Sequence, residues 1–413
     1  MKLTRVGALA AVAILAFTAC TPGGGSTGDK GEIEIWSSLP RQGSSKGQTD
    51  TIVNAINLKL TQIESKVDGW TIKYVDQDDS TAEAGKWTPE RETDNATKAV
   101  ANDKLVAYIG TFNSGAAKLS IPVLCEAGIP MISPANTYPG LTVPEGAEEG
   151  EPGKYYPNGC TRNYFRVVPQ DNLQGLAAAS WANELGVKKV YVLDDTEIYG
   201  KGIADAFELN AKNIGLEVLG HDAAPGKSTD FKATALKIKA AGAELVYYGG
   251  ITQNNAGQLW KDLREAMADV LLMGPDGILE DAFIEAAGAA AEGTLITFGG
   301  GDPENYTGTA ATFKADYEAA YPGSSLQAYS IYGYEATNVL IAAIEKASKA
   351  GAKDVKELRA GTIKALSETT DFAGVTGTFS FDANGDTSTK LFTGFKVEGG
   401  KFAFSIDLSS AIK

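Results

Sequence analysis

Histidine and cysteine, the usual ligands of structural metals, are scarce in this sequence. Among 413 residues there are one histidine, His221, and three cysteines. A zinc site draws about four ligands, mostly from these two residue types, so the sequence indicates no metal centre. A catalytic triad needs a histidine base beside its nucleophile, and we expect His221, just past a short strand, to lie on the surface. We therefore expect neither a cofactor nor catalysis.

The sequence also lacks the motifs that identify many enzymes and nucleic-acid-binding proteins. It has no Gly-x-x-x-x-Gly-Lys-Ser/Thr phosphate loop, and neither a Gly-x-Ser-x-Gly elbow nor a Gly-x-Gly-x-x-Gly turn joins a predicted strand to a helix. The formal net charge is −15 and basic residues do not cluster, which argues against nucleic acid as a partner. Paired carboxylates stay open as acid–base catalysts, but no spacing singles out a pair.

The N-terminus has the pattern of a secretory signal peptide. Lys2 and Arg5 precede an apolar run at 6–17, which is too short for a permanent transmembrane helix and ends just before Cys20. A cysteine at this position resembles the lipidation site of bacterial lipoproteins. We therefore expect 1–19 to be removed and Cys20 to carry lipid, with plain secretion as the alternative.

The segment 20–31 is rich in glycine, serine, threonine and proline and has no apolar periodicity, which is typical of a flexible linker. Two or three acyl chains on Cys20 would hold the protein on a membrane, where a single chain binds only marginally. We expect an extracytoplasmic protein, anchored to the outer face of the cell membrane or periplasmic.

The length of the remaining chain predicts two domains. Removal of the signal peptide leaves 413 − 19 = 394 residues, more than one ordinary hydrophobic core accommodates. With Cys20 lipidated, Cys125 and Cys160 remain, and a pair in an oxidising compartment is expected to form a disulfide.

Short runs rich in Val, Ile, Tyr and Leu alternate with longer segments of helical period, which predicts an α/β fold with parallel sheets and right-handed crossovers. The expected strands are 32–36, 71–75, 105–109, 130–132, 190–193, 245–248, 270–273 and 295–298. The expected helices are 48–65, 91–102, 173–185, 202–213, 231–241 and 256–268.

Two regions break this alternation. A loop rich in Gly, Pro and Glu at 139–159 indicates the first crossing between lobes. From Gly374 onward the pattern predicts antiparallel strands at 378–381, 391–397 and 402–406, with Asn384-Gly385 as a turn. Asp382, Asn384 and Asp386 imitate a calcium loop, but the glycine and the final acidic residue are misplaced, so we expect no calcium there.

Proteins with parallel α/β sheets bind their ligands beyond the carboxyl ends of the strands. Three predicted strands of this sequence are followed by polar residues at that end. The segment 108–115 contains Phe112, Asn113 and Ser114 beyond its strand, and Ser114 is expected to be a helix N-cap or an anion-binding hydroxyl. The segment 130–137 ends with Ala135, Asn136 and Thr137. The segment 271–277 brings Asp276 to the tip of a strand, where it could also serve its own turn.

The order of these segments, with Tyr247-Tyr248-Gly249-Gly250 and Ala291-Glu292-Gly293, resembles the leucine/isoleucine/valine-binding protein family of type I periplasmic binding proteins. The resemblance covers nearly the whole mature chain. It implies two Rossmann-like lobes with parallel central sheets, joined by three hinge crossovers near Val167, Thr297 and Phe379. The expected N-terminal lobe is 32–167 with 298–379, and the expected C-terminal lobe is 168–297 with 380–413.

The resemblance also implies the roles of individual residues. Ser114 and Thr137, with amides of their loops, would hold a ligand carboxylate, and the carbonyl of Ala135 would accept from its ammonium. Asp276 stands where the family has a glutamate that pairs with the ammonium, and it is one methylene shorter.

Tyr199 and Tyr329 match aromatic positions that flank the ligand, whereas Ile251 replaces an aromatic residue and Asn113 a smaller, less polar one. The ligand is expected to be a branched-chain or related amino acid. Asn113 favours a ligand with a polar end, because an apolar one would leave its amide unpaired. Amides and urea-like solutes stay open as alternatives.

The implied function is that of a monomeric receptor that closes on a small molecule and delivers it to the permease and ATPase of an ABC importer. Only a ligand that contacts both lobes favours the closed form. A ligand-sensing module of a signalling complex is the alternative, and a surface enzyme is the weakest reading.

Overall fold

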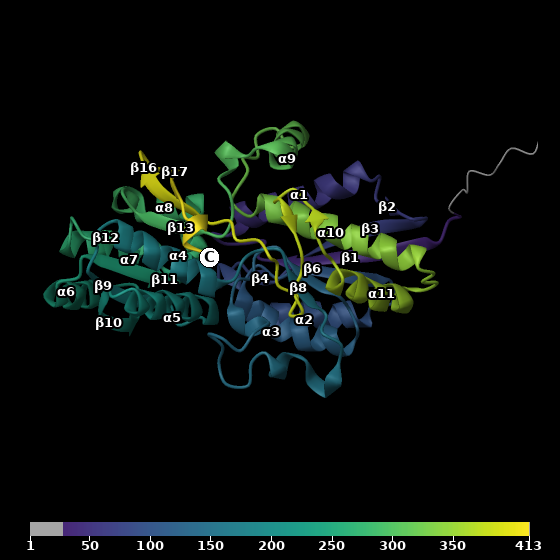
Figure 1. Ribbon diagram of the computed structural model, residues 1–413, viewed down its shortest axis with the longest axis horizontal. Helices are drawn as coiled ribbons and strands as arrows, with labels where there is room; N and C mark the ends of the chain where they lie inside the picture. Colours follow the sequence, from purple (N-terminus) through teal and green to yellow (C-terminus); the bar gives the residue numbers. More distant parts are fainter. Residues whose placement is uncertain (1–27, 413) are drawn as a thin grey trace, which may run out of the picture.

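The computed structural model describes residues 28–412, which form two α/β lobes side by side (Figure 1). The predicted signal peptide, Cys20 and most of the linker at 20–31 lie outside the described residues. Each lobe has one large central sheet dominated by parallel pairing, and helices cover the sheets. The predicted fold class is confirmed.

The first sheet has six strands in the order β2-β3-β1-β6-β7-β8, and all neighbours pair in parallel except β2 and β3. Its strands are β1 (Gly31–Leu39), β2 (Lys66–Val67), β3 (Trp70–Asp78), β6 (Leu105–Gly110), β7 (Met131–Ser133) and β8 (Tyr164–Arg166). Strands β4 (Ser80–Thr81) and β5 (Lys86–Trp87) form a separate two-stranded antiparallel sheet.

The second sheet has seven strands in the order β10-β9-β11-β12-β13-β16-β17. Its parallel strands are β9 (Lys189–Asp194), β10 (Glu217–Ala223), β11 (Leu245–Gly249), β12 (Leu271–Gly274) and β13 (Leu295–Phe298). The antiparallel hairpin β16 (Thr393–Glu398) and β17 (Lys401–Asp407) completes one edge.

The six helices whose bounds were predicted are present, each with both ends within four residues of the predicted positions. Those of the first half are α1 (Lys46–Gln62), α2 (Pro89–Ala101), α3 (Ser114–Glu126), α4 (Asp171–Glu184) and α5 (Ile198–Asn213). Those of the second half are α6 (Lys232–Ala241), α7 (Ala256–Ala266), α8 (Asp281–Ala287), α9 (Gly308–Ala320), α10 (Ser330–Lys349) and α11 (Val355–Ser367).

Strands β6 and β11 consist almost entirely of apolar and aromatic residues, which suits strands covered by helices on both faces. Every residue of β6 and of β11 is buried, as expected for parallel strands in a doubly covered sheet. Apolar and polar residues therefore do not alternate along these two strands. The short continuous apolar run of each strand is the pattern that predicted it from the sequence.

The C-terminal region differs from the prediction in its pairing. Residues 378–379 form β15, which pairs with β14 (Phe372–Ala373), and the long hairpin is β16 with β17, joined by Gly399 and Gly400. Both glycines have positive φ, which suits a two-residue hairpin turn. Asn384-Gly385 does lie in a tight turn, but that turn closes only a single bridge between Phe381 and Thr387.

The carboxylates that imitate a calcium loop have structural partners. Asp382 accepts hydrogen bonds from the backbone N–H groups of Asn384 and Asp386, at 2.8 and 2.9 Å. Asp386 forms a buried ion pair with Arg166 at 2.5 Å. Residues 382–386 therefore lie against β8 of the first sheet, whereas β16, which begins at Thr393, belongs to the second sheet.

None of the helices in the described range has the length and apolar content needed to cross a bilayer.

Candidate functional site

The first lobe contributes two neighbouring loops to a small cavity between the lobes. Phe112, Asn113 and Ser114 follow β6, and Ala135 follows β7. Strands β6 and β7 are parallel neighbours, so their carboxyl ends meet at one edge of the sheet.

Ser114 is the first residue of α3, and Asn113 occupies the N-cap position without a side-chain capping bond. The prediction that Ser114 is the N-cap is therefore wrong by one residue. Its hydroxyl instead accepts from the backbone N–H of Tyr138 at 3.4 Å. The first N–H groups of a helix have no partner within it, and the helix dipole favours an anion there. This end of the cavity suits a carboxylate.

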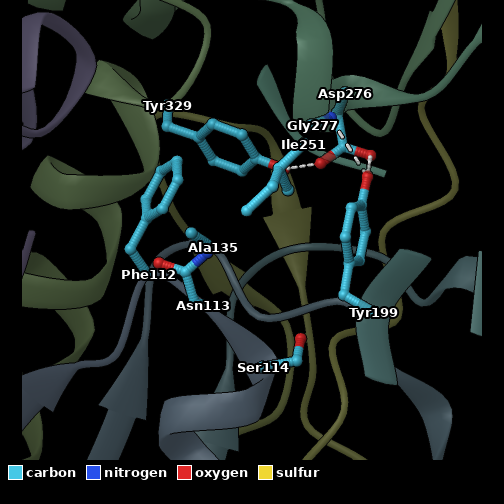
Figure 2. Close-up of a pocket in the computed structure, with 9 residues that line it drawn as sticks. All are labelled: Phe112, Asn113, Ser114, Ala135, Tyr199, Ile251, Asp276, Gly277 and Tyr329. Atoms are coloured by element: carbon cyan, nitrogen blue, oxygen red, sulfur yellow. Dashed lines mark hydrogen bonds between the residues drawn. The ribbon is translucent and has the colours of Figure 1, made fainter. Parts of the chain in front are cut away.

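The second lobe supplies the opposite wall. Tyr199 lies in the first turn of α5, Ile251 follows β11, and Asp276 and Gly277 follow β12. Tyr329, which directly precedes α10, completes the lining, and its ring packs edge-on against Phe112 with centroids 5.6 Å apart. Figure 2 shows these side chains converging on one cavity from several elements.

Asp276 is the acidic residue that lines the cavity, and it is 4% exposed. Its Oδ1 accepts from Nε2 of Gln174 at 2.7 Å. Oδ1 also accepts from the Tyr199 hydroxyl at 2.9 Å, and Oδ2 accepts from the Tyr329 hydroxyl (Figure 2). Burial raises the pKa of Asp276, although these three hydrogen bonds oppose the shift. The carboxylate is thus held rigidly at the far end of the cavity from Ser114.

Two predicted site residues are not among those that line the cavity. Asn136 is fully buried: its amide donates to the carbonyl of Phe112 at 2.9 Å and accepts from the Tyr164 hydroxyl at 3.0 Å. It therefore ties the two loops of the first lobe together. Thr137 is also buried, at 4% exposed.

Sequence reasoning missed the residues that support the second wall. Asp195, at the end of β9, is buried and accepts from the backbone N–H of Ile251 at 3.1 Å and from the amide of Asn254 at 2.7 Å. Burial and the charge of Glu197 raise the pKa of Asp195 to about 7. The sequence signal that could have identified Asp195 is a carboxylate immediately after a predicted buried strand.

Side chains of the two lobes meet at the mouth of the cleft. Lys86 of β5 forms an ion pair with Glu197 at 2.6 Å and donates to Asn254 at 2.8 Å. Trp87 also donates to Glu197, at 3.3 Å, and the amide of Gln253 donates to Ser45. These contacts link the lobes in a closed arrangement.

His221 is not the surface residue expected from the sequence. It lies within β10, is partly buried, and its ring nitrogens contact Glu208 at 2.6 Å and Asp194 at 3.1 Å. His221, Asp205 and Glu208 each offer one possible metal-ligand atom, and these atoms lie within 4.8 Å of one another. Asp205 and Glu208, however, also form ion pairs with lysines. The cluster is thus neutralised by ion pairs.

A disulfide joins Cys125 at the end of α3 to Cys160, with Cα atoms 5.9 Å apart. It fastens the loop 139–159 to the helix whose N-terminus faces the cavity.

A family model described as periplasmic binding protein matches residues 32–401. The Leu/Ile/Val-binding protein homolog 2 of Brucella abortus is 29% identical over 379 residues, which are 90% of this chain and 93% of the relative. Among solved structures, the branched-chain amino acid transporter substrate-binding protein LivJ of Streptococcus pneumoniae, in complex with isoleucine, is 26% identical with a TM-score of 0.73, covering 91% of this chain and 99% of its own. A solute-binding protein of an R. palustris ABC transporter, in complex with benzoate, is 21% identical with a TM-score of 0.74, covering 91% and 96%.

Proposed function

The chain belongs to the periplasmic binding protein family, and on that premise we propose that it is the extracytoplasmic amino-acid receptor of an ABC importer. It would bind its ligand between the lobes and present the closed form to the permease and ATPase. Catalysis is not part of this function. Anchoring to the membrane through lipid on Cys20 belongs to the same proposal.

The observation that carries the proposal is the chemistry of the two ends of the cavity. A helix N-terminus and the Ser114 hydroxyl lie on the first lobe, and the Asp276 carboxylate lies on the second. An α-amino acid carries the complementary groups, a carboxylate and an ammonium, both attached to one carbon atom. Its carboxylate would bind at Ser114, and its ammonium would bind the Ala135 carbonyl and Asp276.

The ligand side chain would lie among Phe112, Tyr199, Ile251 and Tyr329, which form an apolar and aromatic wall. Such a wall suits a branched-chain or related side chain, and Asn113 offers one polar contact. The Brucella relative named for Leu, Ile and Val, and the Streptococcus protein solved with isoleucine, support this ligand class.

Ligand binding would drive closure because its contacts are divided between the lobes. Lys86 and Glu197 would then form their ion pair only in the closed form, which adds a ligand-independent contribution to closure. The permease would recognise this closed arrangement of the lobes.

The test is a thermal-shift screen of the purified protein against the common amino acids, short amides and urea, since a ligand of the folded state raises the melting temperature. We expect a shift with branched-chain or related amino acids. A shift with amides alone would replace the ligand class and keep the receptor. The absence of any shift would contradict the amino-acid receptor.

A further inference from the structure

Asp195 joins the contact between the lobes to the wall of the cavity. It follows β9 in the second lobe, and its Oδ2 accepts from the backbone N–H of Ile251 at 3.1 Å and from Nδ2 of Asn254 at 2.7 Å. Its Oδ1 accepts from the backbone N–H of Glu197 at 3.0 Å. Ile251 lines the cavity. Asn254 and Glu197 both contact Lys86 across the cleft. One buried carboxylate therefore holds both regions in place.

Asn254 continues this connection to Lys86. Its Nδ2 donates to Asp195 and also to Oε1 of Glu197, at 3.1 Å. Its Oδ1 is thereby left to accept from Nζ of Lys86 at 2.8 Å. Lys86 in turn pairs with Oε1 of Glu197 at 2.6 Å. The four residues thus form a closed ring of hydrogen bonds at the cleft mouth.

The ring crosses between the lobes because Lys86 is fixed to the first one. The backbone N–H groups of 41–42, just after β1, donate to the Ser80 hydroxyl of β4 at 3.1 and 3.0 Å. The ring of Trp87, beside Lys86, packs against the first turn of α3, where a Cβ atom on Gly115 would lie 2.6 Å from it. The hairpin β4–β5 therefore belongs to the first lobe, and opening of the cleft takes Lys86 away from its partners in the second.

The ionised form of Asp195 is the one that the ring requires. Its three hydrogen-bond partners among the described residues are all N–H groups. A proton on Oδ2 would compete with the N–H groups of Ile251 and Asn254 for the same lone pairs. An Asn254 amide released from Asp195 can turn and direct its N–H groups at the Lys86 ammonium, which repels them. Protonation therefore loosens the cavity wall and the contact between the lobes together.

We propose that Asp195 is a positioning residue that couples closure of the lobes to the shape of the cavity, and that only its ionised form supports closure. The inference rests on the proposed function in one respect, that the lobes close on a ligand. It extends that function, because it makes closure depend on the pH of the surroundings, whichever ligand is bound.

The charges near Asp195 give this dependence its sign. Burial and the charge of Glu197 raise the pKa of Asp195 to about 7. In the closed form Lys86 offsets the charge of Glu197, and opening removes Lys86, so the open form has the higher pKa. Closure therefore releases protons, and ligand affinity rises as the pH rises through about 7 and then levels off.

The other titratable groups around Asp195 keep one charge state or one set of partners during closure. Burial raises the pKa of Tyr248, on the neighbouring β11, well above its ordinary value of 10, so this tyrosine stays neutral. Asp194, which precedes Asp195, pairs with His221 inside the second lobe. Movement of the lobes leaves that pair unchanged, so its titration cancels from the affinity.

The matched variants are Asp195→Asn and Asp262→Asn. Asp262 is also buried and accepts from a backbone N–H, that of Phe231 at 2.7 Å, but it lies on α7 and does not line the cavity. The probe is L-leucine, and its binding is measured by calorimetry at about pH 6 and about pH 8. We expect the unaltered protein to bind about three- to tenfold more tightly at the higher pH, and Asp262→Asn to keep that ratio.

In Asp195→Asn the affinity should no longer change with pH, and the loss relative to the unaltered protein should be larger at about pH 8 than at about pH 6. A purely structural role would give the same loss at both. Lys86→Met should flatten the profile as well, because Lys86 is the charge that moves away on opening. Small-angle X-ray scattering supplies a readout without ligand: the radius of gyration should fall between the two pH values in the unaltered protein and stay constant in Asp195→Asn.

Parallel pH profiles of Asp195→Asn and the unaltered protein, in calorimetry or in scattering where L-leucine does not bind, would overturn the inference and leave the receptor fold intact. Absence of L-leucine binding, with a radius of gyration that depends on pH only when Asp195 is present, would contradict the leucine-like ligand and keep the inference. Absence of both effects would contradict both.

Discussion

The hydroxyl of Tyr329, at the start of α10, donates a hydrogen bond to Oδ2 of Asp276, at the end of β12. Tyr329 packs with Phe112 and Phe298 through edge-on ring contacts. The bond therefore connects the aromatic wall of the cavity to its carboxylate and fixes the orientation of both (Figure 2). A hydrogen bond to a charged group contributes about 1.5–3 kcal/mol.

Removal of that hydroxyl should weaken ligand binding without removing the wall. In Tyr329→Phe the ring contacts remain, and Asp276 keeps its bonds from Tyr199 and Gln174. We expect the dissociation constant for the amino acid found in the screen to rise about tenfold, in line with the energy of one such bond. The control is Tyr321→Phe, because Tyr321 is a partly buried tyrosine at the C-cap of α9 that does not line the cavity. Equal affinities of the two variants would show that the Tyr329 hydroxyl is dispensable.

Loss of the carboxylate itself should be more damaging. Asp276→Ala leaves Tyr199, Tyr329 and Gln174 without their shared acceptor and the ligand amine without its proposed partner. We expect binding to weaken at least tenfold in calorimetric titrations, with the folded state checked by circular dichroism. An unchanged dissociation constant would remove Asp276 from the site.

The ion pair at the cleft mouth should stabilise the closed form. Lys86→Met removes the contacts with Glu197 and Asn254 and keeps most of the side-chain volume. Both partners are partly exposed, so the effect should be modest, roughly a two- to fivefold loss of affinity that shrinks as salt is added. Lys73→Met is the control because Lys73 pairs with Glu34 inside one lobe. An equal loss in both variants would show that Lys86 has no special part in closure.

Part of the cavity lining could be predicted because it follows the ends of parallel strands, and the family resemblance supplied Tyr199, Ile251 and Tyr329. Eight predicted residues line it: Phe112, Asn113, Ser114, Ala135, Tyr199, Ile251, Asp276 and Tyr329. Asn136 does not line the cavity, because its side-chain amide forms hydrogen bonds with Phe112 and Tyr164 instead. The direction in which a loop side chain points cannot be predicted from the spacing of residues in the sequence.

Gln174 escaped prediction for a different reason. It lies on α4, directly after the first crossing, and its proximity to Asp276 depends on how the helix packs beside β13 rather than on any strand end. The pairing of the C-terminal strands also depended on tertiary context, since β16 joins the sheet beside β13, which is distant in sequence.

The disulfide should stabilise the first lobe. It closes a loop with a sequence separation of 35 residues, for which the chain-entropy model gives about 3–4 kcal/mol. We expect non-reducing mass spectrometry to find a Cys125–Cys160 linked peptide, and Cys125→Ser with Cys160→Ser to lower the melting temperature by several degrees. Two alkylatable thiols in the native protein would contradict the pairing.

His221 should make stability depend on pH, with a sign fixed by its contacts. Hydrogen bonds to Asp194 and Glu208 raise the pKa of His221 above its ordinary value of 6.5, so the folded state binds the proton more tightly than the unfolded chain. The stabilisation is full below the unfolded pKa and is lost as pH rises through the folded pKa. In His221→Asn the deficit in melting temperature relative to the unaltered protein should be larger at about pH 5.5 than at about pH 9. A deficit that grows with pH would mean that the neutral imidazole, not the imidazolium, is the form that this cluster stabilises.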